Sequence, residues 1–379
     1  MEGFSQALGR LRRQRPRLVP WLWVAGRVPW EHLLPDGLPH LRLESPGRNW
    51  PVEQQLLLRG ADLAEPEGEG RWRRWSAGAV AALSLDPGRV LPMRQWFLGW
   101  RATLEELTAW ANRTGGAGRW LTPPAQVLLM GDKAACQAAL EGAGVPVPPA
   151  LGVPRDFDDL WELMRQAGRS RVFLKPCHGS SASGVVALEA GRGGVQAFST
   201  LELTAAEGEV RLYNRRRIQV WRGLTEVRRL VSAVVAERCL AQVWVPKAGL
   251  AGGPFDLRVV VIGGRARQVM VRLGRGPLTN SLLGGGKAEV AAVQERMGPA
   301  GWARLLTVCE QTMARAFPGA LSAGLDVLVE PDFRTVRVLE VNAFGDLLPR
   351  LLHEGRDTYS WEVLAANGAA PAQVSATGA

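Results

Sequence analysis

The chain has 379 residues, enough for two or three domains, and its 46% apolar and 22% charged residues are ordinary for a globular protein. Its formal net charge of +10 suits an anionic partner such as a nucleotide, a nucleic acid or an acidic peptide. Four widely spaced cysteines without a Cys-x-x-Cys pair argue against a disulfide framework or a zinc site, and the longest early apolar stretch, residues 18–26, is too short to span a membrane. We therefore expect a cytoplasmic protein without a membrane partner.

Residues 1–125 contain ten of the fifteen tryptophans, and we predict that they form an N-terminal α/β domain. Apolar runs at 18–25 and 41–43 predict two short strands, and a turn at 45–47 leads into a further segment at 52–59. Trp75 and Trp100 either line a ligand cleft or pack in the core.

Residues 126–245 show a clearer alternation of helix and strand. Asp132 is placed to cap a helix at 133–143, and apolar spacing predicts a second helix at 156–167. Strands are predicted at 172–175, 185–188, 219–221 and 240–245.

A turn of small and polar residues at 178–184 follows Lys175, which ends a predicted strand. Gly184 and the hydroxyls of Ser180 and Ser181 suit close approach to an anion, although a plain polar turn has the same composition. His178 is either a proton carrier or a hydrogen-bonded turn histidine.

Lysine is rare in this chain. Only four of the 46 basic residues are lysines, namely Lys133, Lys175, Lys247 and Lys287. Each lysine either has no specific role and lies on a solvated surface, or stands where a compact ammonium is needed and a planar guanidinium does not fit.

Residues 246–362 supply further strands at 257–262, 268–272, 326–330 and 336–342, with a helix at 302–316, and residues 363–379 read as a flexible tail. Arg258 and Arg272 lie on neighbouring predicted strands, where both could point into one cleft and bind phosphate. Asn280 and the glycines after it could wrap an acidic group. The arginine-rich stretch 211–229 is either an anion-facing patch or a solvated surface.

The last two strands form a predicted hairpin that carries the strongest chemical signal. If Glu330 lies opposite Val336, Asp326 lies opposite Glu340, and Asn342 projects from the same face as Glu340. These oxygens are hard ligands that hold Mg²⁺ together with nucleotide phosphates. The alternative is an edge hairpin whose acids are solvated.

Taken in this order, the motifs resemble the ATP-grasp superfamily, which includes D-alanine–D-alanine ligase, glutathione synthetase and glutamate ligases. The match runs from about Lys133 to Asn342. It implies an α/β, ATP-grasp-like fold with a pre-ATP-grasp domain at 1–125, a lid and N-terminal half at 126–245, and a core sheet with the metal site at 246–362.

The resemblance also implies a role for each motif. Lys133 and Lys175 would clasp the phosphates of ATP, and the turn with Ser180, Ser181 and Gly184 would fold over them. Gln242, Trp244 and Val245 would contact the base, and Lys247 would lie near the ribose. Arg258, Arg272 and Asn280 would face the phosphate and substrate, and Asp326, Glu340 and Asn342 would hold Mg²⁺, or alternatively Mn²⁺. The family often has a glutamate where this chain has Gln242.

The activity implied is ligation of a small-molecule or peptide carboxylate to an amine, or less often a thiol, through an acyl-phosphate, with release of ADP and phosphate. Three alternatives stay open: a phosphotransferase on the same fold, a nucleotide-binding regulatory protein without ligase activity, and a nucleic-acid binder supported only by charge. We do not expect a nucleic-acid partner. Neither substrate nor the oligomeric state follows from the sequence.

Overall fold

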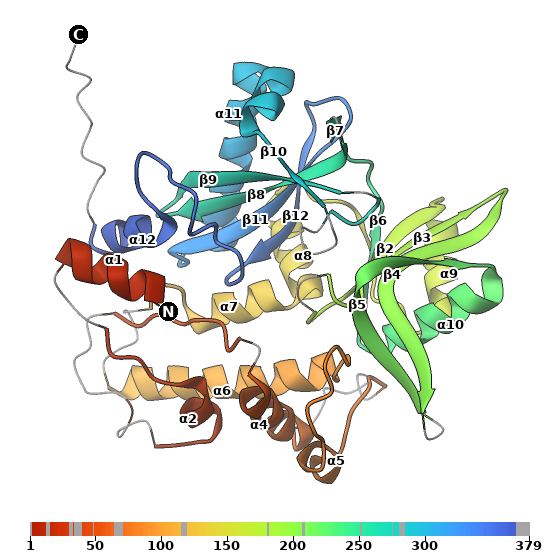
Figure 1. Cartoon of the computed structure of the whole chain (residues 1–379), viewed down its shortest axis with the longest axis horizontal. Helices are drawn as coiled ribbons and strands as arrows, with labels where there is room; N and C mark the ends of the chain where they lie inside the picture. The colour runs from red at the N-terminus through yellow and green to blue at the C-terminus, as the bar shows by residue number, and fades with distance from the viewer. Residues whose placement is uncertain are drawn as a thin grey trace.

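The computed structural model describes residues 2–12, 16–29, 33, 40–47, 49–63, 71–114, 120–179, 182–206, 209–250, 252–274, 276–279 and 285–368. These residues form two antiparallel sheets beside a helical N-terminal unit (Figure 1), so the predicted α/β fold class is confirmed. No helix within these ranges is long and apolar enough to cross a membrane.

The regular elements that the structure describes in the N-terminal unit are helices, and the two strands predicted there, at 18–25 and 41–43, are not formed. Its helices are α1 (Glu2–Arg12), α2 (Trp21–Ala25), α4 (Trp50–Ala61), α5 (Ala77–Ala81) and α6 (Met93–Arg113). The expected first strand is instead α2, and Leu41 makes only an isolated bridge with Trp120. A short apolar run bounded by Pro20 and Gly26 does not distinguish a strand from a helix.

The core of this unit lies between α4 and α6. Leu56, Trp100 and Leu104 are buried there together, so Trp100 is a core residue. Trp75 instead lies beneath the guanidinium groups of Arg73 and Arg89.

Two short helices, α7 (Pro124–Gly131) and α8 (Lys133–Gly142), lead from the N-terminal unit toward the two sheets (Figure 1). Asp132 caps α8 as predicted, because its Oδ1 accepts hydrogen bonds from the N–H groups of Ala134 (3.0 Å) and Ala135 (3.2 Å). The cap fixes Lys133 as the first residue of the helix.

The first sheet has the strand order β1-β6-β2-β3-β4-β5. Its elements are β1 (Ala150–Gly152), α9 (Phe157–Gln166), β2 (Arg171–Pro176), β3 (Val186–Gly191), β4 (Gly194–Ala206), β5 (Glu209–Arg222), α10 (Leu224–Val235) and β6 (Cys239–Val243). Helices α9 and α10 cover one face, where Leu160 and Leu230 pack against Val172 and Leu188 (Figure 1). Strands β4 and β5 form a long ribbon that the sequence analysis largely missed.

The second sheet has the strand order β10-β9-β8-β11-β12, with β7 paired to β8. Its elements are β7 (Gly249–Leu250), β8 (Gly253–Ile262), β9 (Arg265–Leu273), β10 (Lys287–Ala288), α11 (Val290–Ala316), β11 (Ser322–Val329) and β12 (Val336–Asn342). Helix α11 packs on one face and bends at Gly298, whose φ is 67°.

The chain then forms α12 (Thr358–Ala366). This helix extends beyond residue 363, where the tail was predicted to begin, and residues 369–379 lie outside the described part. Trp361 of α12, with Leu347 and Leu348, packs against Val260 and Met270 on the second face of the second sheet. That face is therefore apolar at one end, which leaves its other end for polar side chains.

Candidate functional site

The polar end of the second sheet brings charged side chains from four strands onto one face. The pleat places Asp256 and Arg258 of β8 on the side opposite Leu257 and Val259, which are buried in the core under α11. Cross-strand pairing puts Arg272 opposite Asp256, Asp326 opposite Arg258, and Glu340 opposite Asp326. The predicted opposition of Asp326 and Glu340 is therefore confirmed.

The register that was expected to produce this pair is off by one residue near the turn. Val336 pairs with Val329 rather than with Glu330, and the pairing shifts between Asp326 and Val327. One extra residue of β12, Leu339, is accommodated there as a bulge. The bulge places both Leu339 and Glu340 toward the site.

Asp326 holds two arginines. Its Oδ1 accepts from Arg258 Nε at 2.6 Å and lies 2.9 Å from Arg272 Nη2, and its Oδ2 accepts from Arg258 Nη2 at 3.3 Å. Burial opposes the charge of Asp326, but the two guanidinium groups outweigh it and hold the pKa of this carboxyl below its usual value. Arg258 and Arg272 thus meet at one carboxylate.

A second carboxylate continues this ion-pair network. Asp256 Oδ1 accepts from Arg272 Nε at 2.7 Å, and Asp256 Oδ2 accepts from Lys247 Nζ at 2.9 Å and from the hydroxyl of Thr279. Lys247, which was predicted to lie near a ribose, therefore has its ammonium on the carboxylate that positions Arg272. Asp256 was not assigned a role from the sequence, although its place two residues before Arg258 in an apolar strand put it on the same face.

Gly324 leaves room for Arg258. A β-carbon at position 324 would lie 3.0 Å from Arg258 Nη1 and 3.2 Å from its Cδ. Gly324 pairs with Asn342, whose Nδ2 donates to the Gly324 carbonyl at 3.3 Å. Because the amide nitrogen of Asn342 faces the Gly324 carbonyl, its amide oxygen points away from that carbonyl.

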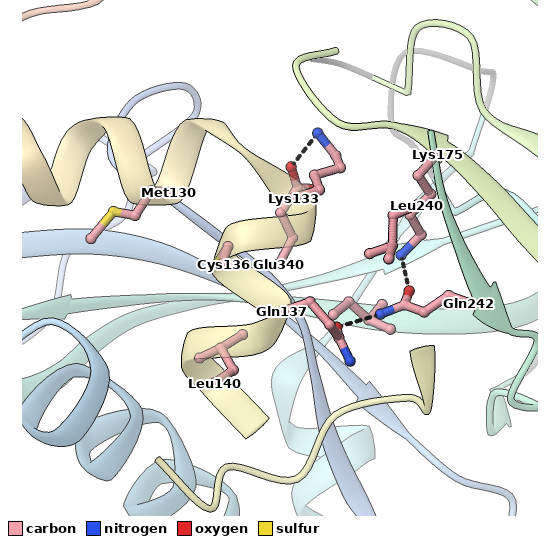
Figure 2. Close-up of a pocket in the computed structure, with 10 residues that line it drawn as sticks. Met130, Lys133, Cys136, Gln137, Leu140, Lys175, Leu240, Gln242 and Glu340 are labelled. Carbon is pink, nitrogen blue, oxygen red and sulfur yellow. Dashed lines mark hydrogen bonds and ion pairs between the residues drawn. The ribbon is translucent and has the colours of Figure 1, made fainter. Parts of the chain in front are cut away.

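Lys133 reaches Glu340 from helix α8. Its Nζ lies 3.0 Å from Glu340 Oε1 (Figure 2). The same Nζ also donates to the Gly179 carbonyl. Burial opposes the charge of Lys133, but Glu340 outweighs it and raises the pKa of this lysine. The helix-borne lysine and the metal-ligand candidate Glu340 are thus joined directly.

Lys175 approaches the same cleft from the first sheet, where it pairs with Leu240. Its Nζ donates to Gln242 Oε1 at 2.6 Å (Figure 2). Burial lowers the pKa of Lys175 to about 8, against the opposing effect of Glu340. Among the described residues no carboxylate bonds to this ammonium, so the positive charge that it carries below that pKa is not neutralised by a direct partner.

A small cavity lies between these side chains. It is lined by Met130, Lys133, Cys136, Gln137, Leu140, Lys175, Leu240, Gln242, Leu339 and Glu340 (Figure 2). Its volume of about 10 Å³ is the room that one water needs, so it cannot hold a nucleotide.

The turn after Lys175 is fixed at both ends. At its start, His178 is buried, its ring centroid lies 4.1 Å from that of Phe97, and its Nε2 is 3.2 Å from Asp132 Oδ2. Burial lowers the pKa of His178 to about 4, against the effect of Asp132, so this histidine is neutral near pH 7 and serves as a turn residue. Gly184 closes the turn at φ 75°, a backbone conformation that favours glycine.

Three predicted site residues cannot be placed. Ser180 and Ser181 of the turn, and Asn280 of the glycine-rich segment, lie outside the described residues.

The predicted hinge, Gln242 to Val245, joins the two sheets. Gln242 is buried within β6. The N–H groups of Val243 and Trp244 donate to the carbonyls of Pro149 and Arg171, so these two backbone donors are not free to contact a base. The indole of Trp244 packs against Phe173, with ring centroids 5.2 Å apart.

An apolar cluster connects the hinge to the second sheet. It contains Val243, Val245 and Leu328, with Leu151 and Leu339 packed against it. The sequence did not identify this cluster, because its members come from both sheets and from the bulge in β12.

The four lysines have different surroundings: Lys133 and Lys175 line the small cavity, and the ammonium of Lys247 lies on Asp256. Lys287 is exposed on β10 and pairs with Arg272, which places both side chains on the same face of the sheet.

The donor set fits a hard divalent cation. Glu340 and Asn342 each offer an oxygen on the site face, and Asp326 Oδ2 carries one long hydrogen bond. Among the described residues, no group of three or more His, Cys, Asp or Glu side chains gathers that could hold a metal ion. An ion at this place would therefore need ligands beyond carboxylates, such as Asn342 and phosphate oxygens.

Neither a protein-family model nor a curated protein matches the sequence. Among solved structures, D-cycloserine synthetase DcsG gives a TM-score of 0.45 and 17% identity over 71% of this chain and 80% of that chain. Macrocyclase MdnB from Microcystis aeruginosa MRC gives 0.40 and 18% over 76% and 74%. A RiPP-associated ATP-grasp ligase from Chryseobacterium gregarium, in complex with ADP and with a leader and core peptide, gives 0.43 and 13% over 71% and 69%.

Proposed function

We propose that this chain is an ATP- and Mg²⁺-dependent ligase of the ATP-grasp type, which joins a carboxylate to an amine through an acyl-phosphate and releases ADP and phosphate. The observation that carries the proposal is the charge arrangement in the cleft. Within the described residues, five cations (Lys133, Lys175, Lys247, Arg258 and Arg272) surround three carboxylates (Asp256, Asp326 and Glu340). The excess of two positive charges suits a triphosphate.

The lysines and arginines would act on different parts of the nucleotide. Lys133 and Lys175 come from the helix and the first sheet and would hold the phosphate chain between them. Arg272 and Arg258 would neutralise the phosphoryl group in transfer, while Asp326 keeps both guanidinium groups fixed in advance. Positioning and charge neutralisation are what phosphoryl transfer requires most.

The metal ligands would be Asp326, Glu340 and Asn342. Mg²⁺ held by them would supply charge neutralisation at the phosphates when bound. Glu340 is the residue that links this set to Lys133, so it would hold the lysine and the ion in a common arrangement.

The chemistry proceeds in two transfers. A carboxylate oxygen of the first substrate bonds to the terminal phosphorus of ATP, and ADP leaves with the electrons of the broken bond. The amine nitrogen of the second substrate then bonds to the acyl carbon, phosphate leaves, and the nitrogen gives up a proton. The carboxylate could belong to a small molecule or to a peptide.

A coupled ADP-release screen tests the proposal. Carboxylates (amino acids and peptides) are combined with amines (amino acids and polyamines) in the presence of ATP and Mg²⁺, and each is also omitted in turn. We expect ADP release only when a carboxylate and an amine are both present. ADP release that needs no amine would favour the phosphotransferase, and the absence of saturable ATP binding would contradict both.

A further inference from the structure

Two glutamines link Lys175 to the far end of helix α8. Gln242 Oε1 accepts from Lys175 Nζ at 2.6 Å, and Gln242 Nε2 donates to Gln137 Oε1 at 2.7 Å (Figure 2). Gln137 Nε2 then donates to Glu141 Oε1 at 2.7 Å and to the Pro148 carbonyl at 2.9 Å. Both glutamine residues are buried.

The direction of this chain of hydrogen bonds is fixed from both ends. Carboxylate and carbonyl oxygens only accept, so Glu141 and Pro148 require the amino group of Gln137. The carbonyl oxygen of Gln137 must then face Gln242, whose amino group donates to it. The only remaining oxygen, Gln242 Oε1, points at Lys175, which as an ammonium can only donate.

We propose that Gln137 is a positioning residue for the nucleotide: it orients the Gln242 amide so that Lys175 is held in place to bind the phosphates of ATP. The inference rests on the proposed function, since it concerns the same site. Gln137 and Lys133 stand four residues apart on one face of α8, so the helix positions one lysine directly and the other through two amides.

The proposal explains why position 242 carries a glutamine. A glutamate at position 242 would present one oxygen to Lys175 and the other to Gln137. To donate to that second oxygen, the Gln137 amide would have to flip, and its own oxygen would then face the oxygens of Glu141 and Pro148, which cannot donate. A buried acceptor would then lie against another acceptor, which is costly in a buried site.

Binding of ATP with Mg²⁺ to the full chain, measured by calorimetry, tests the role of Gln137. Gln137→Met keeps the length of the side chain but removes all three hydrogen bonds of the amide. We expect it to weaken ATP binding about tenfold, since it leaves buried polar groups unpaired. Gln294→Met, the same change on the exposed face of α11, is the control and should bind ATP as the wild type does.

Two further measurements separate positioning from a general structural effect. In a Lys175→Met background, Gln137→Met should add no further loss of ATP affinity, because the interaction it serves is already gone. Gln137→Met alone should also move the loss of ATP binding at alkaline pH to a lower pH, because Lys175 loses an oriented acceptor that favours its charged form. Additive losses, or an unchanged pH profile, would overturn the proposal.

The outcomes distinguish this inference from the function on which it rests. If the wild type fails to bind ATP, the proposed function fails. If the wild type binds ATP, and Lys175→Met weakens binding while Gln137→Met does not, only the role of Gln137 is refuted. If Gln137→Met does not fold, Gln137→Leu replaces it in the binding measurements. The pH profile of ATP binding by Gln242→Met then tests the Lys175–Gln242 hydrogen bond directly.

Discussion

Asp326 and Glu340 lie directly opposite each other on β11 and β12, yet their carboxylates bind different cations: Asp326 binds Arg258 and Arg272, and Glu340 binds Lys133. Two opposed carboxylates would repel each other without such partners. The pair therefore joins the second sheet to helix α8, and a change in either acid should disturb the cations on its own side of the cleft.

Glu340→Gln should sharply lower turnover of ATP, and it should moderately lower the melting temperature because it leaves the buried Lys133 without its charged partner. The amide keeps the shape of the side chain but removes the charge that raises the pKa of Lys133 against its burial. Removing a charged group that stabilises a phosphoryl-transfer site typically costs about a hundredfold or more in rate. Steady-state ADP release and thermal unfolding check the two parts of this prediction.

Glu330→Gln is the matched control, because Glu330 follows β11 in the same hairpin and also binds a single basic side chain, Arg337, at 2.6 Å. We expect normal turnover in this variant. Normal turnover in Glu340→Gln as well would remove the metal ligand and its lysine from the proposed mechanism.

The sequence predicted the elements of the site better than their connections. Strands rich in apolar residues, such as β2 and β12, and the helix capped by Asp132 are encoded locally, so their positions could be predicted. The pair Asp326 and Glu340 was predicted from a register that is wrong at the turn, because a bulge cannot be read from alternation when Leu339 and Glu340 both face the site. The role of Gln137 and the apolar cluster around Leu328 depend on contacts between segments about 100 residues apart, on which local patterns carry no information.

Gly184→Ala should impair ATP binding through the backbone. Residue 184 has φ 75°, and a β-carbon there would lie 2.7 Å from Pro176 Cγ, so an alanine both strains the turn and displaces the proline next to Lys175. The strain alone costs about 1–3 kcal/mol.

Gly168→Ala is the control: its φ is +60° and no atom lies within 4 Å of the added carbon, so it should lose stability but not ATP affinity. Equal ATP affinities in the two variants would show that the turn does not touch the phosphates.

Lys175→Met should reduce ATP affinity or turnover by about a hundredfold or more, that is about 3 kcal/mol. Arg169→Met, which removes one positive charge from an exposed position, tests whether net charge alone explains the loss. The fold should not suffer in Lys175→Met, because burial disfavours the charged lysine in the folded state. A large fall in melting temperature would instead assign Lys175 a structural role.

The pH dependence of ATP binding should reveal the same lysine. Burial lowers the pKa of Lys175 to about 8, so its ammonium is present below that pH and is lost as the pH rises through it. ATP affinity should therefore be highest below about pH 8 and decline above it, and the decline should be absent in Lys175→Arg because an arginine stays charged.

In the unfolded chain this lysine has its ordinary, higher pKa. It therefore destabilises the fold at pH below about 8, and that cost is relieved as the pH rises toward the pKa of the unfolded chain. Calorimetric titrations across this range at constant ionic strength measure the first effect; a decline that persists unchanged in Lys175→Arg would place the titrating group elsewhere.

The reaction class can be decided by trapping the activated carboxylate. In the proposed mechanism the bond that breaks in ATP lies before the terminal phosphate, so the nucleotide product is ADP and the activated substrate is an acyl-phosphate. Hydroxylamine supplied in place of the amine should attack that acyl carbon and give a hydroxamate in an amount equal to the ADP released. The guanidinium groups of Arg258 and Arg272, fixed by Asp326, suit the transfer of a single phosphoryl group. Release of AMP would show that the carboxylate is adenylated instead, and ADP release with a phosphorylated hydroxyl and no hydroxamate would show a kinase built on the same cleft.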